Sequence, residues 1–357
     1  MSVPASRSYT IASIPGDGIG VEVTAAAQAV LDQAAAGHGF DLAWTELDWS
    51  CQRYRETGAM MPEDGIETLG SYDAVFLGAV GYPGVPDHVS LWGLLIPIRR
   101  AFAQYVNLRP VRLLPGVRSP LADREREDID LVVVRENSEG EYSLIGGRHD
   151  VGLPTEVAVQ QSIFTRRGVT RIMTYAFELA RARSGRVSSA TKSNGIVHTM
   201  PFWDEIFAEV AVQYPDVRSE QVHVDALAAR LVLAPDQLDV IVASNLFGDI
   251  LSDLAAAVAG SLGIAPSGNL NPEREFPSMF ESVHGSAPDI AGQGVANPVA
   301  QILAGAMMLD HLGEPTAAAA VSAAVDAVVQ MRTVTPDLGG TATTQAVTDA
   351  VCRALRA

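Results

Sequence analysis

The chain has 357 residues, of which 48% are hydrophobic, and it carries a formal net charge of -17 at pH 7. A chain longer than roughly 250–300 residues usually divides into two domains, so we expect two domains with a substantial core. The negative charge argues against nucleic acid or an anionic membrane as a partner, because the surface as a whole repels phosphate. An anionic substrate would therefore need a local group of arginines.

Cysteine usage and hydropathy both argue against export. The chain has two cysteines, Cys51 and Cys352, which are too few and too distant for a disulfide scaffold or a cysteine-rich zinc site. The N-terminus lacks a basic region followed by a long apolar run, and the long uncharged stretch at residues 254–272 is interrupted by Gly, Pro and Asn. We therefore expect a cytoplasmic protein without a signal peptide or a membrane span.

Short apolar runs rich in Val and Ile alternate with helix-patterned segments, which predicts an α/β protein with a buried sheet. The predicted strands are residues 9–14, 74–77, 131–134, 187–190, 222–224 and 240–243. Alanine-rich segments at 316–331 and 346–357 predict tightly packed helices. Ligands of open parallel sheets lie beyond the carboxyl ends of the strands, where this sequence has Arg135, Lys192, Asp225 and Asp249.

The glycine-rich segment IPGDGIG, residues 14–20, follows the first predicted strand. It invites a Rossmann interpretation, with a dinucleotide phosphate at the N-terminus of the next helix. The third glycine of that fingerprint is missing, because Val21 or Val23 occupies its place. A tight turn between strand and helix is the competing interpretation.

An amphipathic helix is predicted for LWGLLIPIRRAFAQY, residues 91–105, which contains Arg99 and Arg100. Arg109 follows in NLRP, and Arg135 ends an apolar strand in VVVREN. Three guanidinium groups, those of Arg99, Arg109 and Arg135, could bind both carboxylates of a small diacid bidentately. Ordinary surface ion pairs are the alternative for any one of them.

Asp249 and Asp253, in FGDILSD, are four residues apart, so a helix would place both carboxylates on one face. These like charges repel unless a cation lies between them, and oxygen ligands favour Mg²⁺ or Mn²⁺. Asp225 is a plausible third ligand. Alternatively, Asp249 complements the positive end of the helix and Asp253 is simply solvated.

Lys192, in SSATKSNG, is the single lysine of a chain whose other 24 basic side chains are arginines. Lysine can lose its proton when it is desolvated or placed among cations, whereas arginine in a protein cannot. A lysine beside arginines and a divalent metal would have a lowered pKa suited to a general base. The competing explanation is a genome biased against lysine codons.

Taken together, these motifs resemble the metal-dependent β-decarboxylating dehydrogenases, the family of isocitrate and 3-isopropylmalate dehydrogenases. The resemblance covers nearly the whole chain and is carried by IPGDGIGVEV, NLRPVRL, VVVRENSEGEYS, FTRRGV, TKSNG, ASNLFGDILSD and VHGSAPDIAGQGVANP. It implies a three-layer α/β fold with a mixed, largely parallel sheet, and not a Rossmann fold. It also implies a large cofactor-binding domain (1–104 and 263–357), a substrate and dimerisation domain (105–262), and an arm near 143–165 that pairs with a second subunit.

The resemblance further implies a role for each matching residue. Arg99, Arg109 and Arg135 would bind the substrate carboxylates, and Asp225, Asp249 and Asp253 would hold Mg²⁺ or Mn²⁺. Lys192 would be the general base and Tyr142 the proton donor to the enolate, with Lys192 and the catalytic Asp225 supplied by the neighbouring subunit of a homodimer. The cofactor-binding residues would be Glu281, His284, Gly285, Ser286, Ala287, Asp289, Ile290 and Asn297. Asp289 favours NAD over NADP, because a carboxylate accepts both ribose hydroxyls and repels a 2′-phosphate.

The segments YPGVPDHVSLWG and QYVNLRPVRLLPGV are most similar to the D-malate and tartrate dehydrogenases within this family. Trp92, next to Leu95 and Ile96, implies a small substituent at C3 of the substrate, although Ser90 keeps isocitrate formally possible. The implied reaction is NAD-dependent decarboxylation of D-malate to pyruvate and carbon dioxide, and oxidation of tartrate, with K⁺ as a further candidate cofactor. The alternatives are a 3-isopropylmalate dehydrogenase and a non-catalytic diacid-binding regulatory subunit.

Overall fold

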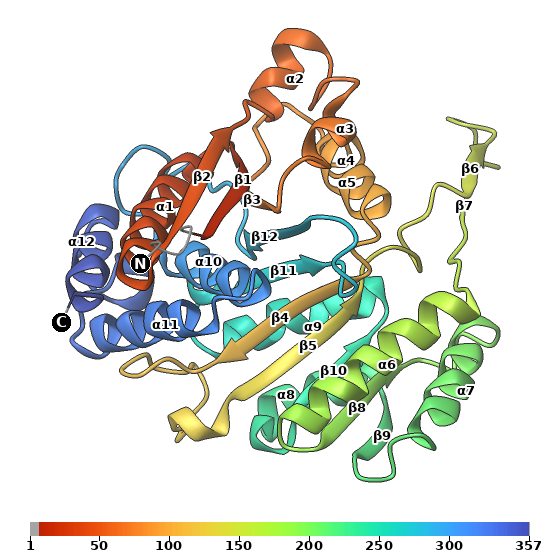
Figure 1. Ribbon diagram of the computed structural model, residues 1–357. Helices are drawn as coiled ribbons and strands as arrows, with labels where there is room; N and C mark the ends of the chain where they lie inside the picture. The colour runs from red at the N-terminus through yellow and green to blue at the C-terminus, as the bar shows by residue number, and fades with distance from the viewer. Residues whose placement is uncertain (1–6, 357) are drawn as a thin grey trace.

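A computed structural model describes residues 7–356 of the protein, and its centre is one large mixed β-sheet (Figure 1). The sheet has ten strands in the order β2-β1-β3-β12-β11-β4-β5-β10-β8-β9. Its strands are β1 (Arg7–Gly16), β2 (Phe40–Glu46), β3 (Ala74–Ala79), β4 (Val106–Arg112), β5 (Asp130–Glu136), β8 (Arg186–Thr191), β9 (Arg218–His223), β10 (Val240–Ala243), β11 (Pro266–Leu270) and β12 (Ser278–Ser282). Most neighbouring strands are parallel, whereas β4 and β11 run antiparallel to their neighbours.

The strand order divides the sheet into two halves that differ in their origin along the chain. The half β2-β1-β3-β12-β11 comes from both chain ends, and the half β4-β5-β10-β8-β9 comes from the middle. The β4–β11 ladder joins the halves, pairing Leu108 with Gly268. The division into domains at 104 and 262 remains a prediction. Residues 1–6 and 357, which belong to the predicted large domain, lie outside the described range.

Helices cover both faces of the sheet and complete three layers (Figure 1). The helices are α1 (Ile19–His38), α2 (Cys51–Thr57), α3 (Gly65–Leu69), α4 (Asp87–Ser90), α5 (Ile96–Ala101), α6 (Arg166–Ala182), α7 (Thr199–Ala211), α8 (Val224–Leu233), α9 (Asn245–Val258), α10 (Val299–His311), α11 (Pro315–Gln330) and α12 (Thr344–Ala354). Successive strand residues face opposite layers. Ile11 packs with α1 in one apolar cluster, whereas Ala12 joins Trp49 and Leu94 in another.

The predicted α/β class with a mixed, largely parallel sheet is confirmed, and each predicted strand overlaps an observed one. The strand predicted for residues 222–224 ends one residue too late: β9 ends at His223, and Val224 already begins α8. The single helix predicted for 91–105 is also wrong in its extent. It is a π-helical turn, Leu91–Leu95, followed by α5, and it ends where Ala103 adopts a φ of 44°.

The glycine loop after β1 does not have the form that the Rossmann interpretation requires. The first amide of α1, on Ile19, donates to the Ser286 carbonyl at 2.8 Å. Gly18 has a φ of 58°, and a Cβ there would lie 2.0 Å from the same carbonyl oxygen. The loop therefore supports the segment around Ser286 instead of receiving a phosphate, which agrees with the fold that the family resemblance implies.

A hairpin stands apart from the large sheet. Its strands, β6 (Gly146–His149) and β7 (Val157–Gln160), pair antiparallel, and Figure 1 shows them extending away from the body of the molecule. All eight strand residues are exposed. Within residues 7–356, none of the helices combines the length and hydrophobicity that crossing a membrane requires.

We expect Asp17→Ala to destabilise the fold, because its buried carboxylate accepts three backbone N–H groups, those of Cys51, Gln52 and Gly81. These donors would lose their acceptor, at a cost of about 1–3 kcal/mol in the free energy of unfolding measured with urea. Asp64→Ala is the matched control, because the Asp64 side chain is exposed and makes no capping hydrogen bond. Equal effects of the two substitutions would contradict the role of Asp17.

Candidate active site

Two arginines and two aspartates from three neighbouring elements meet where α9 packs on the central strands β4 and β5. Arg109 comes from β4, Arg135 from β5, and Asp249 and Asp253 from α9. Arg109 Nη1 lies 3.3 Å from Asp249 Oδ1 and 3.2 Å from Asp253 Oδ1. Both carboxylates therefore converge on a single cationic position, as their spacing of four residues on a helix predicts.

Arg135 is the most deeply buried charged group of this cluster. Its Nη1 donates to Asp249 Oδ1 at 2.5 Å, while Nε and Nη2 donate to Asn245 Oδ1 at 3.1 and 2.7 Å. Burial, reinforced by the charge of Arg109, lowers the pKa of Arg135 to about 10. The guanidinium remains charged near neutral pH, and its acceptors offset the cost of its burial.

The pKa values of the two aspartates shift in opposite directions. Burial acts to raise the pKa of Asp249, but the nearby charges of Arg135 and Arg109 outweigh it and lower that pKa. For Asp253, burial dominates over the attraction of Arg109, and the pKa is raised. Asp249 is thus the permanently charged member of the pair, and Asp253 is the more adaptable one.

Arg99, the third predicted arginine, is paired with another predicted site residue. Its Nη2 lies 3.0 Å from Glu281 Oε1, and both residues are buried. Asn269 Nδ2 also donates to Glu281 Oε1, at 2.7 Å, and Asn269 Oδ1 accepts from Asn107 and Asn137. A buried polar network therefore connects α5, β12, β11 and β4, and it spans the join between the two halves of the sheet.

Tyr142 lies beside the arginine cluster, as predicted. Its hydroxyl donates to Asp249 Oδ2 at 3.2 Å, and the Arg135 guanidinium stands 5.6 Å from the centre of its ring. Burial, together with the negative charge of Asp249, raises the pKa of Tyr142. The phenol therefore keeps its proton at neutral pH and can donate it.

Lys192 and Asp225 form a pair of their own within the chain. Lys192 Nζ lies 2.6 Å from Asp225 Oδ1, and this bond lowers the pKa of the exposed Asp225 carboxylate. Across residues 7–356, no group of three or more His, Cys, Asp and Glu side chains is close enough to hold a metal. One subunit therefore brings Asp249 and Asp253 together but does not add Asp225 to them.

The predicted cofactor segment is an irregular loop between β12 and α10. His284 Nδ1 lies 3.0 Å from the Gly285 carbonyl oxygen, and its buried Nε2 has no partner in the described structure. Burial lowers the pKa of His284, so the imidazole is neutral near pH 7. Ala287 has a φ of 36°, and Asp289 and Gly285 are exposed, whereas Ile290 packs against Ile19 and Val23.

Asn297, predicted to contact the adenine, has a hydrogen bond that the sequence analysis did not foresee. Asn297 Nδ2 donates to Asp337 Oδ2 at 2.9 Å, and its Oδ1 accepts from the Val299 amide. Asp337 also accepts from Ser261 and Thr335. A separation of 40 residues hides this pair from any local pattern.

The sequence analysis also missed the contact that Arg100 of α5 makes with Tyr142 and Trp92. Arg100 Nη2 donates to the Tyr142 carbonyl at 3.1 Å, and its guanidinium lies 5.2 Å from the centre of the Trp92 ring. Ser90, by contrast, is buried and donates to the Asp87 carbonyl within its own turn. The position of Arg100 beside Arg99 was visible in the sequence, but its partner was not.

Comparisons with known proteins identify the family of the chain. The model of the isocitrate/isopropylmalate dehydrogenase family matches residues 10–351. D-malate dehydrogenase (decarboxylating) of Escherichia coli (strain K12) is 55% identical over 355 residues, covering 97% of this chain and 98% of the relative. A probable tartrate dehydrogenase/decarboxylase of Bacillus subtilis (strain 168) is 53% identical over 352 residues, covering 98% and 99%.

Solved structures show the same relationship. The crystal structure of isocitrate dehydrogenase from Methylococcus capsulatus matches with a TM-score of 0.88 and 36% identity, covering 98% of this chain and all of that one. Together these findings define a decarboxylating dehydrogenase with an α/β fold. The chain belongs to the isocitrate/isopropylmalate dehydrogenase family.

We expect Gly248→Ala to displace Arg135, because a Cβ at Gly248 would lie 2.6 Å from the Cβ and Cγ of Arg135. The overpacking should lower the free energy of unfolding by about 1–3 kcal/mol. Gly37→Ala in α1 is the matched control: a Cβ there meets nothing within 4 Å, so it should stabilise by about 0.5–1 kcal/mol. Urea unfolding measures both, and a stabilising Gly248→Ala would contradict the close packing of α9 on β5.

Proposed function

We propose that the protein catalyses the NAD-dependent oxidative decarboxylation of D-malate to pyruvate and carbon dioxide, and the oxidation of tartrate. The observation that carries the proposal is the convergence of Arg109, Arg135 and Tyr142 on Asp249, where α9 packs on the sheet. Relatives at 53–55% identity that are named for these substrates support the choice of substrate. A small dicarboxylic 2-hydroxy acid supplies the carboxylates that such a cluster of cations binds.

The arginines retain free donors for these carboxylates. Within the described chain, the buried Nε atoms of Arg99 and Arg109 have no hydrogen-bond partner. A buried N–H without an acceptor is costly, so a substrate carboxylate that accepts from it gains binding energy. Arg135 would complete the clamp, because its charge already attracts anions to this point.

The aspartates fit a divalent metal. Asp249 and Asp253 approach one cationic nitrogen, Arg109 Nη1, to within 3.3 Å, and their oxygen donors suit Mg²⁺ or Mn²⁺. We assign Asp249 and Asp253 of one subunit and Asp225 of the other as the ligands. Such an ion, when bound, supplies a Lewis acid for the hydroxyl and carboxylate oxygens of the substrate. K⁺ remains a candidate second cation.

The loop from Glu281 to Asn297 fits a dinucleotide. The orphaned, buried Nε2 of His284 offers a polar contact to an adenosine, and Asn297 is oriented by Asp337. NAD, when bound, accepts the hydride from C2 of the substrate. The exposed Asp289 carboxylate favours NAD, because it would accept from two ribose hydroxyls and repel a 2′-phosphate.

Two residues would move the protons of the reaction. Lys192 removes the proton from the C2 hydroxyl while hydride leaves the same carbon, which gives a 2-keto acid. The carboxylate β to this ketone then leaves as carbon dioxide, and Tyr142, whose pKa is raised by burial and by Asp249, returns a proton to the carbon. Asp225 holds Lys192 through the 2.6 Å bond.

The segment before α5 favours a substrate with a small substituent at C3. Trp92 is held by Arg100, which also binds the Tyr142 carbonyl, so a bulky indole lies next to the proton donor. The Ser90 hydroxyl, which could otherwise meet a third carboxylate, donates to the Asp87 carbonyl. Both features favour malate or tartrate over isopropylmalate and isocitrate.

We further propose a homodimer in which the arm of residues 143–165 pairs with a second subunit. The arm exposes apolar side chains that a monomer would leave in water. They are Leu144, Ile145, Val151, Leu153, Val157 and Val159. The two free cysteines are consistent with the cytoplasm, where we place the enzyme.

The reaction is tested by NADH or NADPH absorbance with Mn²⁺ and K⁺ present. Separate assays use D-malate, L-tartrate, meso-tartrate, 3-isopropylmalate and isocitrate, each with NAD and with NADP. We expect kcat/KM to be highest for D-malate or a tartrate with NAD, since Trp92 and Asp289 restrict the two sites. The highest value on 3-isopropylmalate would refute the Trp92 argument, and no turnover at all would favour a regulatory subunit.

Sharing of the site between subunits is tested by mixing two inactive variants. Lys192→Met removes the base, a loss of roughly 10²–10⁴-fold in kcat, and Asp253→Asn weakens the metal site. Random hybrids of the two would have one intact site in half of the dimers, so activity should recover to about a quarter of wild type. Recovery requires that Lys192 and Asp253 act across the interface. If they act within one chain, the mixture stays inactive.

A further inference from the structure

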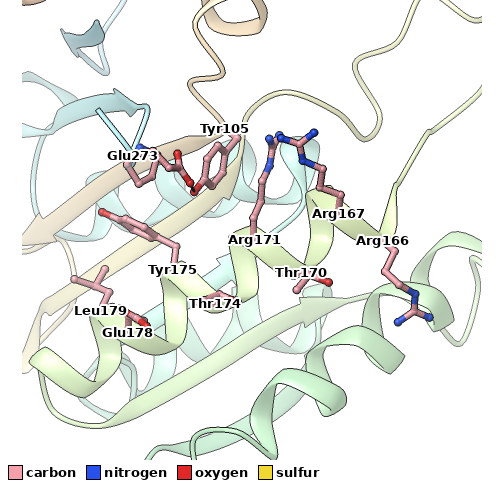
Figure 2. A pocket seen from close by; sticks show the side chains of 11 residues that line it. Tyr105, Arg166, Arg167, Thr170, Arg171, Thr174, Tyr175, Glu178, Leu179 and Glu273 are labelled. Atoms are coloured by element: carbon pink, nitrogen blue, oxygen red, sulfur yellow. Dashed lines mark hydrogen bonds between the residues drawn. The ribbon is translucent and has the colours of Figure 1, made fainter. Parts of the chain in front are cut away.

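A groove of about 830 Å³ lies on the α6 face of the sheet, away from the arginine cluster (Figure 2). Arg135 and Glu136 are consecutive residues of β5, so their side chains leave the sheet on opposite faces. Arg135 binds Asn245 and Asp249 of α9, whereas Glu136 faces Arg171 of α6. The groove is therefore separate from the proposed active site.

One end of the groove carries two arginines whose charge the protein compensates only in part. Arg167, in the first turn of α6, makes no ion pair or hydrogen bond with any residue between 7 and 356. Arg171, one turn later, stacks on Tyr105 at 4.1 Å, and its buried Nε has no partner. Two like charges four residues apart destabilise a helix, and cations are disfavoured at its N-terminal end.

The acids near these arginines compensate them only in part. Glu136 lies 3.8 Å from Arg171 Nη2, and burial raises the pKa of Glu136, while Arg171 Nη2 also donates to Ser138 Oγ at 2.6 Å. Glu273 accepts from the Tyr105 hydroxyl at 2.7 Å, and Glu178 accepts from Tyr214. On a chain with a net charge of -17, a local excess of cations attracts a specific anion rather than anions in general.

The rest of the groove is largely apolar, although Glu178 and Glu273 also border it. Tyr105, Tyr175, Leu179 and Pro272 line it beyond the arginines, and Figure 2 shows Tyr175 and Leu179 further along α6. A ligand that fits both parts has a charged group at one end and a flat, apolar body at the other. A phosphate monoester carries close to two negative charges at pH 7, which suits two guanidinium groups one turn apart.

We propose that this groove binds a phosphate monoester with an aromatic or other apolar body, with the phosphate on Arg167 and Arg171 and the body against Tyr175, Leu179 and Pro272. This binding needs neither the diacid nor the dinucleotide, so it goes beyond the proposed function and can fail independently of it.

Isothermal titration calorimetry of the full-length protein with phenyl phosphate tests the proposal. Inorganic phosphate and phenol serve as probes of the two halves of the ligand, and each should bind roughly tenfold more weakly than phenyl phosphate or worse. Phenyl phosphate that binds no tighter than inorganic phosphate would overturn the apolar part of the site.

Two adjacent arginines provide a matched pair of variants. Arg167→Gln should weaken phenyl phosphate binding roughly tenfold, because a charge-assisted bond is lost, and Arg167→Glu should weaken it further. Arg166→Gln removes the same charge one residue away, but the Arg166 guanidinium pairs with Glu205 and Glu209 and points away from Arg167 and Arg171 in Figure 2, although Arg166 also borders the groove. Its effect should stay below about twofold. Equal weakening by Arg166→Gln and Arg167→Gln, or none by either, would overturn the proposed site.

Discussion

The arrangement of the candidate active site depends on the burial of one guanidinium, that of Arg135. A buried charge must be paired, and the partners, Asn245 and Asp249, both come from the first turns of α9. Gly248 allows that helix to approach β5 closely enough for the bonds to form. Helix α9 is therefore held against the sheet at the point where Asp249 and Asp253 project, which places the carboxylates beside Arg109.

A second constraint operates at the join between the two halves of the sheet. The side chains of Asn107, Asn269 and Glu281 are linked by hydrogen bonds in a buried network that ends on Arg99. Unpaired, each of these groups would cost free energy, so the network fixes β4, β11 and β12 relative to one another. Arg109 of β4 and Arg99 of α5 are thereby held in a common frame, although they come from different halves.

Glycine and arginine contribute to this site in ways that a linear motif does not reveal. The glycine loop after β1 resembles a dinucleotide fingerprint, yet the first amide of the helix that follows it donates to the Ser286 carbonyl and so supports the segment around Ser286. Arg100, next to a predicted substrate arginine, connects Trp92 with the backbone of Tyr142. Ser286 and Tyr142 lie more than 40 residues from Ile19 and Arg100, respectively, so only the folded chain brings these pairs together.

The sequence by itself determined the α/β class and the approximate strands, because apolar periodicity and the ordered motifs are local properties of the chain. It predicted the residues of the site from the same motifs. It also predicted that Asp249 and Asp253 share a face, since helix geometry dictates this from spacing alone. Tertiary structure decided the helix end at Ala103, the pairing of Arg99 with Glu281 and, among the described residues, the separation of Asp225 from the Asp249–Asp253 pair. These depend on contacts between distant segments, whose burial and pairing energies outweigh local preference.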